Sequence, residues 1–169
     1  CESVAYNLKE LGYSTHAIHN NDGTFYDRNN IFSQLGFDTF TPIEYMDVKE
    51  YTPMGWAKDA VLIDEIFKAL EDSKKKDLIY NISVQGHGSY PEIKMLTNPS
   101  ILVSGIEEEK QRNAFEYYVN QLYEMDLFIN DLVSRLENYE EDTVVVLFGD
   151  HLPGFSFTDE DLTNKDIYQ

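Results

Sequence analysis

The sequence VVVLFGDH at residues 144–151 decides more about the fold than any other part of the chain. Its first five residues are apolar and mostly β-branched. A short continuous run of this kind is typical of a strand buried on both faces of a parallel sheet. A glycine follows, and then the metal-competent side chains of Asp150 and His151. Ligands of open α/β sheets bind at the carboxyl ends of the strands, so we expect this pair at a ligand site.

The pair Asp150 and His151 has two interpretations. Aspartate offers a hard oxygen and histidine a borderline nitrogen, a combination suited to Zn²⁺ or Mn²⁺. The alternative is a helix N-cap aspartate beside an ordinary surface histidine. Spacing alone leaves both interpretations open.

The order of elements predicts a single α/β domain. Helical spacing of apolar residues recurs at residues 4–11, 29–35, 60–70 and 112–138. Strand-like runs occupy residues 13–18, 78–84 and 144–148, and loops are expected at 37–55 and 92–109. Strands that alternate with helices predict a largely parallel sheet flanked by helices.

The composition of the chain argues against several classes of function and of site. The 169 residues carry 31 acidic and 13 basic side chains, a net charge of −18, which argues against non-specific nucleic-acid binding. The lone cysteine, Cys1, permits no disulfide or cysteine-based metal site within the chain. No apolar stretch approaches the ~18–20 residues that span a bilayer. The chain opens on a helical pattern without an initiator Met, and we expect it to be a piece of a longer protein.

Three of the four histidines fall in segments that a parallel sheet would bring to one edge. These are His19, His87 and His151, whereas His16 alternates along a strand and is expected to be structural. His87 lies between two glycines, which permit close approach of a ligand. It is a candidate general acid or oxyanion donor, and the alternative is an exposed loop histidine.

A second candidate group precedes the helix expected at residues 29–35. Phe25 and Tyr26 are followed closely by Arg28. A guanidinium beside aromatic rings suits a phosphate group attached to an apolar or sugar-like moiety. The alternative is a surface arginine near a helix start.

Taken together, these segments resemble the sulfatase-like branch of the alkaline phosphatase superfamily, and within it the lipoteichoic acid synthase and phosphoglycerol transferase group. The matching motifs extend in order over about residues 8–154. They are LGY at 11–13, HNN at 19–21, FYDR at 25–28, LGFD at 35–38, VQGHGSYP at 84–91 and FGDH at 148–151. The resemblance implies an alkaline-phosphatase/sulfatase-like α/β fold.

The resemblance also implies roles for the residues of the last two motifs. Asp150 and His151 match two ligands of a divalent cation, most commonly Mn²⁺, with Zn²⁺, Mg²⁺ or Ca²⁺ as other candidates. His87 matches a histidine that contacts the substrate phosphate and assists transfer.

The earlier motifs match the substrate pocket. Arg28 corresponds to an arginine that binds the glycerol-phosphate head group, and His19 to a further pocket histidine. Tyr26 occupies the place of a usual tryptophan, which keeps a stacking surface but adds a hydroxyl.

The chain departs from the family pattern in one important respect. The family's threonine nucleophile and a further acidic metal ligand lie upstream of the matched segments, and Thr15 and Thr24 fall in the wrong places to replace the nucleophile. We therefore expect residues 1–169 to be a central fragment of a catalytic domain, with weak or absent metal binding and negligible turnover alone.

The function implied for the parent protein is metal-dependent transfer of glycerol phosphate from a phosphatidylglycerol-type lipid, through a phospho-threonine intermediate. Its partners would be an anionic phospholipid head group or a glycerol-phosphate polymer. The parent would be anchored at the extracytoplasmic face of a bacterial membrane. The alternatives are a sulfatase or phosphodiesterase of the same superfamily, and a non-catalytic module that binds anionic cell-surface polymers.

Overall fold

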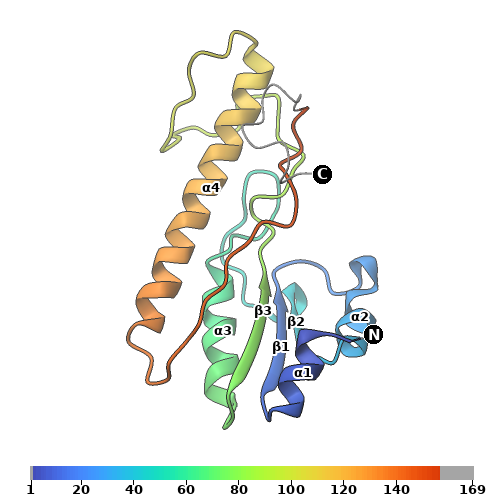
Figure 1. Cartoon of the computed structure of the whole chain (residues 1–169). Coiled ribbons are helices and arrows are strands. Elements are labelled where there is room, and N and C mark those ends of the chain that lie inside the picture. Colours follow the sequence, from blue (N-terminus) through green and yellow to red (C-terminus); the bar gives the residue numbers. More distant parts are fainter. Residues whose placement is uncertain (1, 157–169) are drawn as a thin grey trace, which may run out of the picture.

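A three-stranded parallel sheet forms the centre of the computed structural model, which describes residues 2–156 (Figure 1). The strands are β1 (Ser14–His19), β2 (Thr39–Pro42) and β3 (Asp77–Ile82), in the order β2-β1-β3. His19 pairs with Pro42 on one side and with Ile82 on the other. The last residues of all three strands therefore meet at one edge, and the predicted α/β class with a parallel sheet is confirmed.

Within residues 2–156, four α-helices and two short 3₁₀ helices accompany the sheet. The α-helices are α1 (Val4–Glu10), α2 (Arg28–Gln34), α3 (Val61–Asp72) and α4 (Glu109–Leu136), and the 3₁₀ helices are η1 (Phe25–Asp27) and η2 (Ile43–Tyr45). All four predicted helices are present with small shifts at their ends. Figure 1 shows α4 extending well beyond the sheet, with the loop that follows β3 beside its N-terminal half. Within residues 2–156, no helix is long and apolar enough to cross a membrane.

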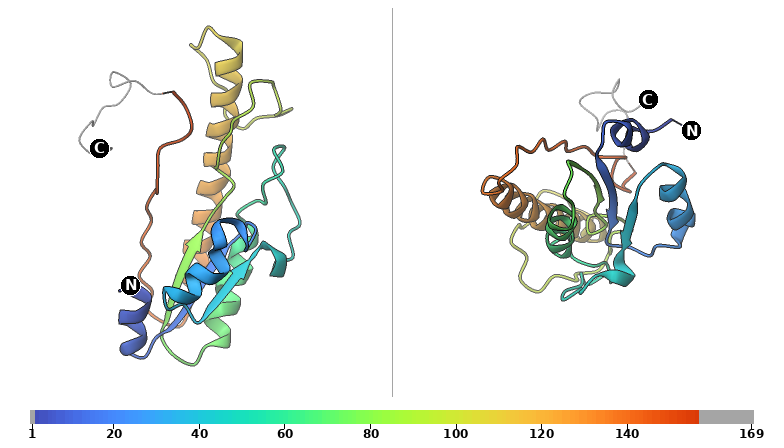
Figure 2. Two further views of the ribbon diagram at one scale, coloured as in Figure 1. Left: turned by 90° about the vertical axis from the view of Figure 1, so that its right-hand side faces the viewer. Right: turned by 90° about the horizontal axis from the view of Figure 1, so that it is seen from below.

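Helices cover the two faces of the sheet with different side chains. On one face, Ile18 of β1 packs against Leu62 and Ile66 of α3 and Phe128 of α4. On the other face, small Ala17 is flanked in register by Phe40 and Tyr80. Figure 2 shows that α2 covers this second face, opposite α3.

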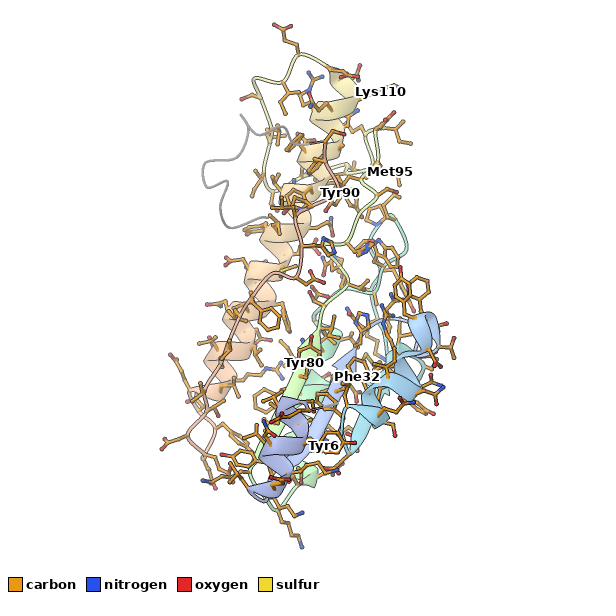
Figure 3. All side chains as sticks on the ribbon, turned by 45° about the vertical axis from the view of Figure 1, so that its right-hand side comes forward. Tyr6, Phe32, Tyr80, Tyr90, Met95 and Lys110 are labelled. Atoms are coloured by element: carbon orange, nitrogen blue, oxygen red, sulfur yellow. The ribbon has the colours of Figure 1, made fainter. Side chains whose placement is uncertain are left out.

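The second face is built from aromatic rings. Phe32 of α2 lies 4.8 Å from the ring of Phe40 and 6.2 Å from that of Tyr80, and Phe37 adds an edge contact at 5.6 Å. Figure 3 shows Phe32 and Tyr80 at the level of the sheet. Both faces of β1 are therefore covered, which makes it the central, buried strand.

Strand β2 lies inside the loop expected at residues 37–55 and was missed by the sequence pattern. It has only four residues, and its order comes from parallel pairing with β1. At its start, Asp38 accepts hydrogen bonds from the backbone N–H of Thr15, at 3.0 Å, and from the Thr15 hydroxyl, at 3.2 Å. Such non-local contacts leave no periodic signal in a short stretch.

The predicted strand at residues 144–148 is wrong for this structure. The segment is extended beside β3 but makes no ladder with it, and Val144, Val146 and Phe148 are 89%, 75% and 70% exposed. A cavity of about 220 Å³, lined by Tyr80, Val146 and other residues, separates it from β3 and α4. A strand needs backbone hydrogen-bond partners, and residues 144–148 do not pair with the open edge of β3.

Candidate functional site

His19 is the last residue of β1 and forms the buried part of the site. Its side chain is 3% exposed, and its Nδ1 lies 2.9 Å from the carbonyl oxygen of Ile82. Burial lowers the pKa of His19 to about 4, against the opposing effect of the Ile82 carbonyl, and the charges of Arg28 and His87 lower it further. The ring is thus neutral at pH 7. With Nδ1–H donating to Ile82, Nε2 is left as a hydrogen-bond acceptor.

Arg28 begins α2, and its positive charge acts on His19. Its guanidinium carbon lies 5.1 Å from the ring centre of Phe25 and 5.9 Å from that of Tyr26, and its Nη1 donates to the carbonyl oxygen of Asp22 at 3.2 Å. Tyr26 is exposed, with φ of 56°. A guanidinium beside aromatic rings keeps further N–H groups available for an anionic group.

The Asp22 carboxylate organises the turn that presents this group. Its Oδ1 accepts from the backbone N–H of Thr24 at 2.7 Å and of Phe25 at 3.0 Å, and from the Thr24 hydroxyl at 2.6 Å. These hydrogen bonds to Thr24 lower the pKa of Asp22. The turn is therefore an Asx-type turn that aims Phe25, Tyr26 and Arg28 toward the end of β1.

His87 lies in the loop after β3 and faces two aromatic neighbours. Its ring centre is 5.6 Å from that of Trp56 and 6.0 Å from that of His151. His87 and His151 share a cavity of about 260 Å³ with Asp150. Among its other lining residues are Ser83, Gly86 and Met125. Figure 3 shows Tyr90, which also lines this cavity, beyond the sheet beside α4.

The side chains of Asp150 and His151 lie near each other. His151 Nε2 lies 3.7 Å from Asp150 Oδ1, and both side chains are mostly exposed. His151 Nδ1 is 2.7 Å from the carbonyl oxygen of Leu152, a hydrogen bond that leaves Nε2 free to coordinate. Residues 150–156 form no helix, so the helix-cap interpretation of Asp150 is wrong. A carboxylate oxygen and an imidazole nitrogen are donor types that Mn²⁺ and Zn²⁺ accept. Residues 2–156, however, contain no group of three or more His, Cys, Asp or Glu side chains that could hold a metal ion.

The remaining polar candidates have structural roles. His16 joins the three strands, with Nδ1 2.7 Å from Thr39 Oγ1 and Nε2 3.2 Å from Asp77 Oδ1. Thr15 is fully buried and its hydroxyl donates to the Gly36 carbonyl at 3.1 Å. The Thr24 hydroxyl donates to Asp22 Oδ1 at 2.6 Å, within the turn before α2.

The sequence did not predict the buried polar group that joins the segments of His19 and His87. Asp59 is fully buried before α3, where it contacts the side chain of Asn20 and the backbone of Gln85. Trp56, in the same loop, contacts the His87 ring. A carboxylate before a helical apolar stripe usually indicates an N-cap, and the sequence held no signal that this one is buried against another loop.

Comparison with known proteins gives a consistent family. Residues 1–167 match the family model described as Sulfatase. A Rhizobium meliloti protein named for cyclic beta-1,2-glucan modification is 30% identical over 151 residues, which is 89% of this chain and 23% of that protein. Lipoteichoic acid synthase 2 of Bacillus subtilis is 25% identical over 153 residues, again 89% of this chain and 23% of that protein.

A solved structure shares the fold. The phosphoglycerol transferase of Streptococcus pyogenes, in complex with sn-glycerol-1-phosphate, superimposes with a TM-score of 0.72 at 20% identity. The match covers 89% of this chain and 39% of that one. The chain thus spans about a quarter of the length of the curated relatives and about two fifths of this structure.

Proposed function

Because the chain belongs to the sulfatase family, we propose that it is the central part of the catalytic domain of a metal-dependent phosphoglycerol transferase. The observation that carries the proposal is the convergence of His19, Arg28 and His87 at the end of the sheet. The charges of Arg28 and His87 both lower the pKa of His19, which supports a placement of the three groups around the end of β1. Arg28 supplies a positive charge and the two histidines supply hydrogen-bonding groups in a chain whose net charge is −18, as an anionic substrate requires.

Each residue of this group is proposed to bind a different part of a glycerol-phosphate group. Arg28 is proposed to bind the head group through charge-assisted hydrogen bonds, with the exposed ring of Tyr26 against the glycerol carbons. The neutral His19 is proposed to accept a hydrogen bond from a glycerol hydroxyl at Nε2. His87 is proposed to donate to the leaving oxygen of the phosphodiester and to protonate it as the bond breaks.

The cation is proposed to bind at Asp150 and His151, with Mn²⁺ as the first candidate. A divalent ion held there would neutralise charge on the phosphoryl oxygens and lower the pKa of an attacking hydroxyl. Two ligands do not fill a coordination shell, so the remaining ligand and the nucleophilic threonine are proposed to come from other parts of the complete protein. We accordingly expect residues 1–169 alone to be inactive.

The substrate is proposed to be a phosphatidylglycerol-type lipid, with the complete protein anchored in a bacterial membrane and this domain outside. The relatives named for lipoteichoic acid synthesis and for glucan modification favour an acceptor in the cell envelope, either a glycerol-phosphate polymer or a glycan. A nucleic acid is not proposed as a partner, because the net charge is strongly negative.

The test uses the complete protein with radiolabelled phosphatidylglycerol in vesicles and Mn²⁺. We expect release of diacylglycerol and transfer of labelled glycerol phosphate, with both lost in His87→Gln and strongly reduced in Arg28→Gln. Lys68→Gln is the matched control, since Lys68 is an exposed cation on α3. Release of free glycerol phosphate without transfer would favour a phosphodiesterase. No release of diacylglycerol by the unaltered protein would contradict the transferase proposal.

A further inference from the structure

Asp59 forms a reciprocal pair of hydrogen bonds with Gln85. The backbone N–H of Asp59 donates to Gln85 Oε1 at 2.8 Å, and the backbone N–H of Gln85 donates to Asp59 Oδ1 at 3.3 Å. Gln85 lies two residues before His87, in the same loop. The start of α3 is therefore clamped to the backbone that presents the His87 imidazole.

The same carboxylate also holds the end of β1. Asn20 Nδ2 donates to Asp59 Oδ1 at 2.8 Å and to the carbonyl oxygen of Ala57 at 3.2 Å. Asn20 is fully buried and directly follows His19. One oxygen atom of Asp59 thus accepts hydrogen bonds from both histidine-bearing segments.

The remaining oxygens of this group have no partner among residues 2–156. Asp59 Oδ2 and Asn20 Oδ1 are both buried acceptors without a hydrogen bond. Burial of an unsatisfied polar atom costs stability, and this network contains two such atoms. Asp59 touches neither the metal pair nor the solvent-exposed cavity, which excludes a direct catalytic contact in this structure.

Additional contacts extend the clamp to α4. Gln85 Nε2 donates to Gln121 Oε1 at 3.1 Å and also to the carboxylate of Glu124. Trp56, three residues before Asp59, packs its ring against that of His87. The loop that contains Trp56 and Asp59 therefore holds both the backbone and the side chain of the His87 loop.

We propose that Asp59 is a positioning residue that holds the His19 and His87 imidazoles in a fixed relative placement at the end of the sheet. The proposal deepens the function proposed above and rests on it for the identity of the substrate. Placement errors of about 1 Å lower transfer rates by about 10²-fold, so a fixed pair of imidazoles has a large effect on turnover.

The test compares Asp59→Ala and Asp59→Asn in the complete protein, with Asp64→Ala as the matched control on the exposed side of α3. The amide of Asp59→Asn keeps an oxygen that can accept from both Asn20 and Gln85. We expect Asp59→Ala to lower kcat about tenfold or more with little change in KM, and Asp59→Asn to restore it. Asp64→Ala is expected to behave as the unaltered protein.

A second readout does not depend on activity. Carbethoxylation by diethyl pyrocarbonate, mapped by mass spectrometry, is expected to become several-fold faster at His19 and His87 in Asp59→Ala, and to stay unchanged at His16. Gln85→Met, which breaks the clamp from the other side, is expected to raise the rate at His87 if Asp59→Ala does not fold.

The outcomes separate this inference from the proposed function. Unchanged carbethoxylation at His19 and His87 in Asp59→Ala would overturn the positioning role, and an equal increase at His16 would do so too, because it would indicate general loosening. Absence of transfer by the unaltered protein together with the expected labelling pattern would overturn only the proposed transferase function.

Discussion

The substitution Asp59→Asn should stabilise the protein at neutral pH and leave its stability unchanged in acid. Burial raises the pKa of Asp59 from 3.8 to about 6, and the nearby Glu124 carboxylate adds to the rise, against hydrogen bonds from Asn20 and Gln85 that lower it. A raised pKa in the folded state means that folding favours the protonated carboxyl. The contribution of Asp59 to stability is therefore complete below pH 3.8 and is lost as the pH rises through about 6.

The magnitude follows from the difference between the two pKa values. At ~1.4 kcal/mol for each unit, the ionised carboxyl weakens folding by about 3 kcal/mol above pH 7, relative to its protonated form. The amide of the Asn variant does not ionise and avoids this cost. The free energy of unfolding of Asp59→Asn minus that of the unaltered protein should rise by about 3 kcal/mol between roughly pH 4 and pH 8.

Urea denaturation at a series of pH values, followed by circular dichroism, measures this difference. Other groups that titrate in the same range, including His19, are present in both proteins and cancel. Asp64→Asn is the control, because the Asp64 side chain is 85% exposed. The free energy of unfolding of this variant minus that of the unaltered protein should stay near zero at every pH. A difference for Asp59→Asn that does not change with pH, or that falls as the pH rises, would refute the reasoning from burial.

Three further predictions concern the site and the core. The depressed pKa of His19, about 4, favours the neutral ring, so its contribution is complete above pH 6.5 and is lost as the pH falls to about 4; replacement by Gln should flatten the acid side of the stability curve measured by denaturation. Gly36→Ala should lower the melting temperature more than Gly12→Ala, because both have φ near +90° but only at Gly36 would the new Cβ lie 2.9 Å from the Tyr6 ring. Leu62→Ala should cost about 2–5 kcal/mol in urea denaturation, since Leu62 is fully buried, whereas the exposed Leu11→Ala should cost little.

The sequence predicted those parts of the fold that depend on local patterns. The apolar stripes at residues 60–70 and 112–138 correspond to α3 and α4, because one face of each helix packs against a neighbour. The strand β2 escaped prediction because four residues carry no periodicity and are ordered by pairing with β1. The run at residues 144–148 has the composition of a buried strand. A strand also needs hydrogen bonds to a neighbouring backbone, however, and residues 144–148 make none with the open edge of β3.

Prediction of the candidate site had a similar limit. The residue types and their place after strands predicted that His19, His87 and His151 would gather, and the structure places them at one end of the sheet. In the polar group of Asn20, Asp59 and Gln85, hydrogen bonds join residues 39 and 26 positions apart. Such contacts depend on how three loops pack together, and they produce no recognisable residue pattern in the sequence.

The two halves of the candidate site differ in how firmly this chain holds them. His19 and the backbone of the His87 loop are held by hydrogen bonds to β3 and to Asp59, so the proposed phosphate-binding half is anchored to the folded core. Asp150 and His151 follow an exposed segment without a backbone ladder, and metal ligands need placement within about 0.5 Å. Firm contacts along residues 144–148 are therefore required before this pair can hold a cation. Metal affinity and the ordering of that segment on β3 should consequently rise and fall together, because both depend on the same backbone.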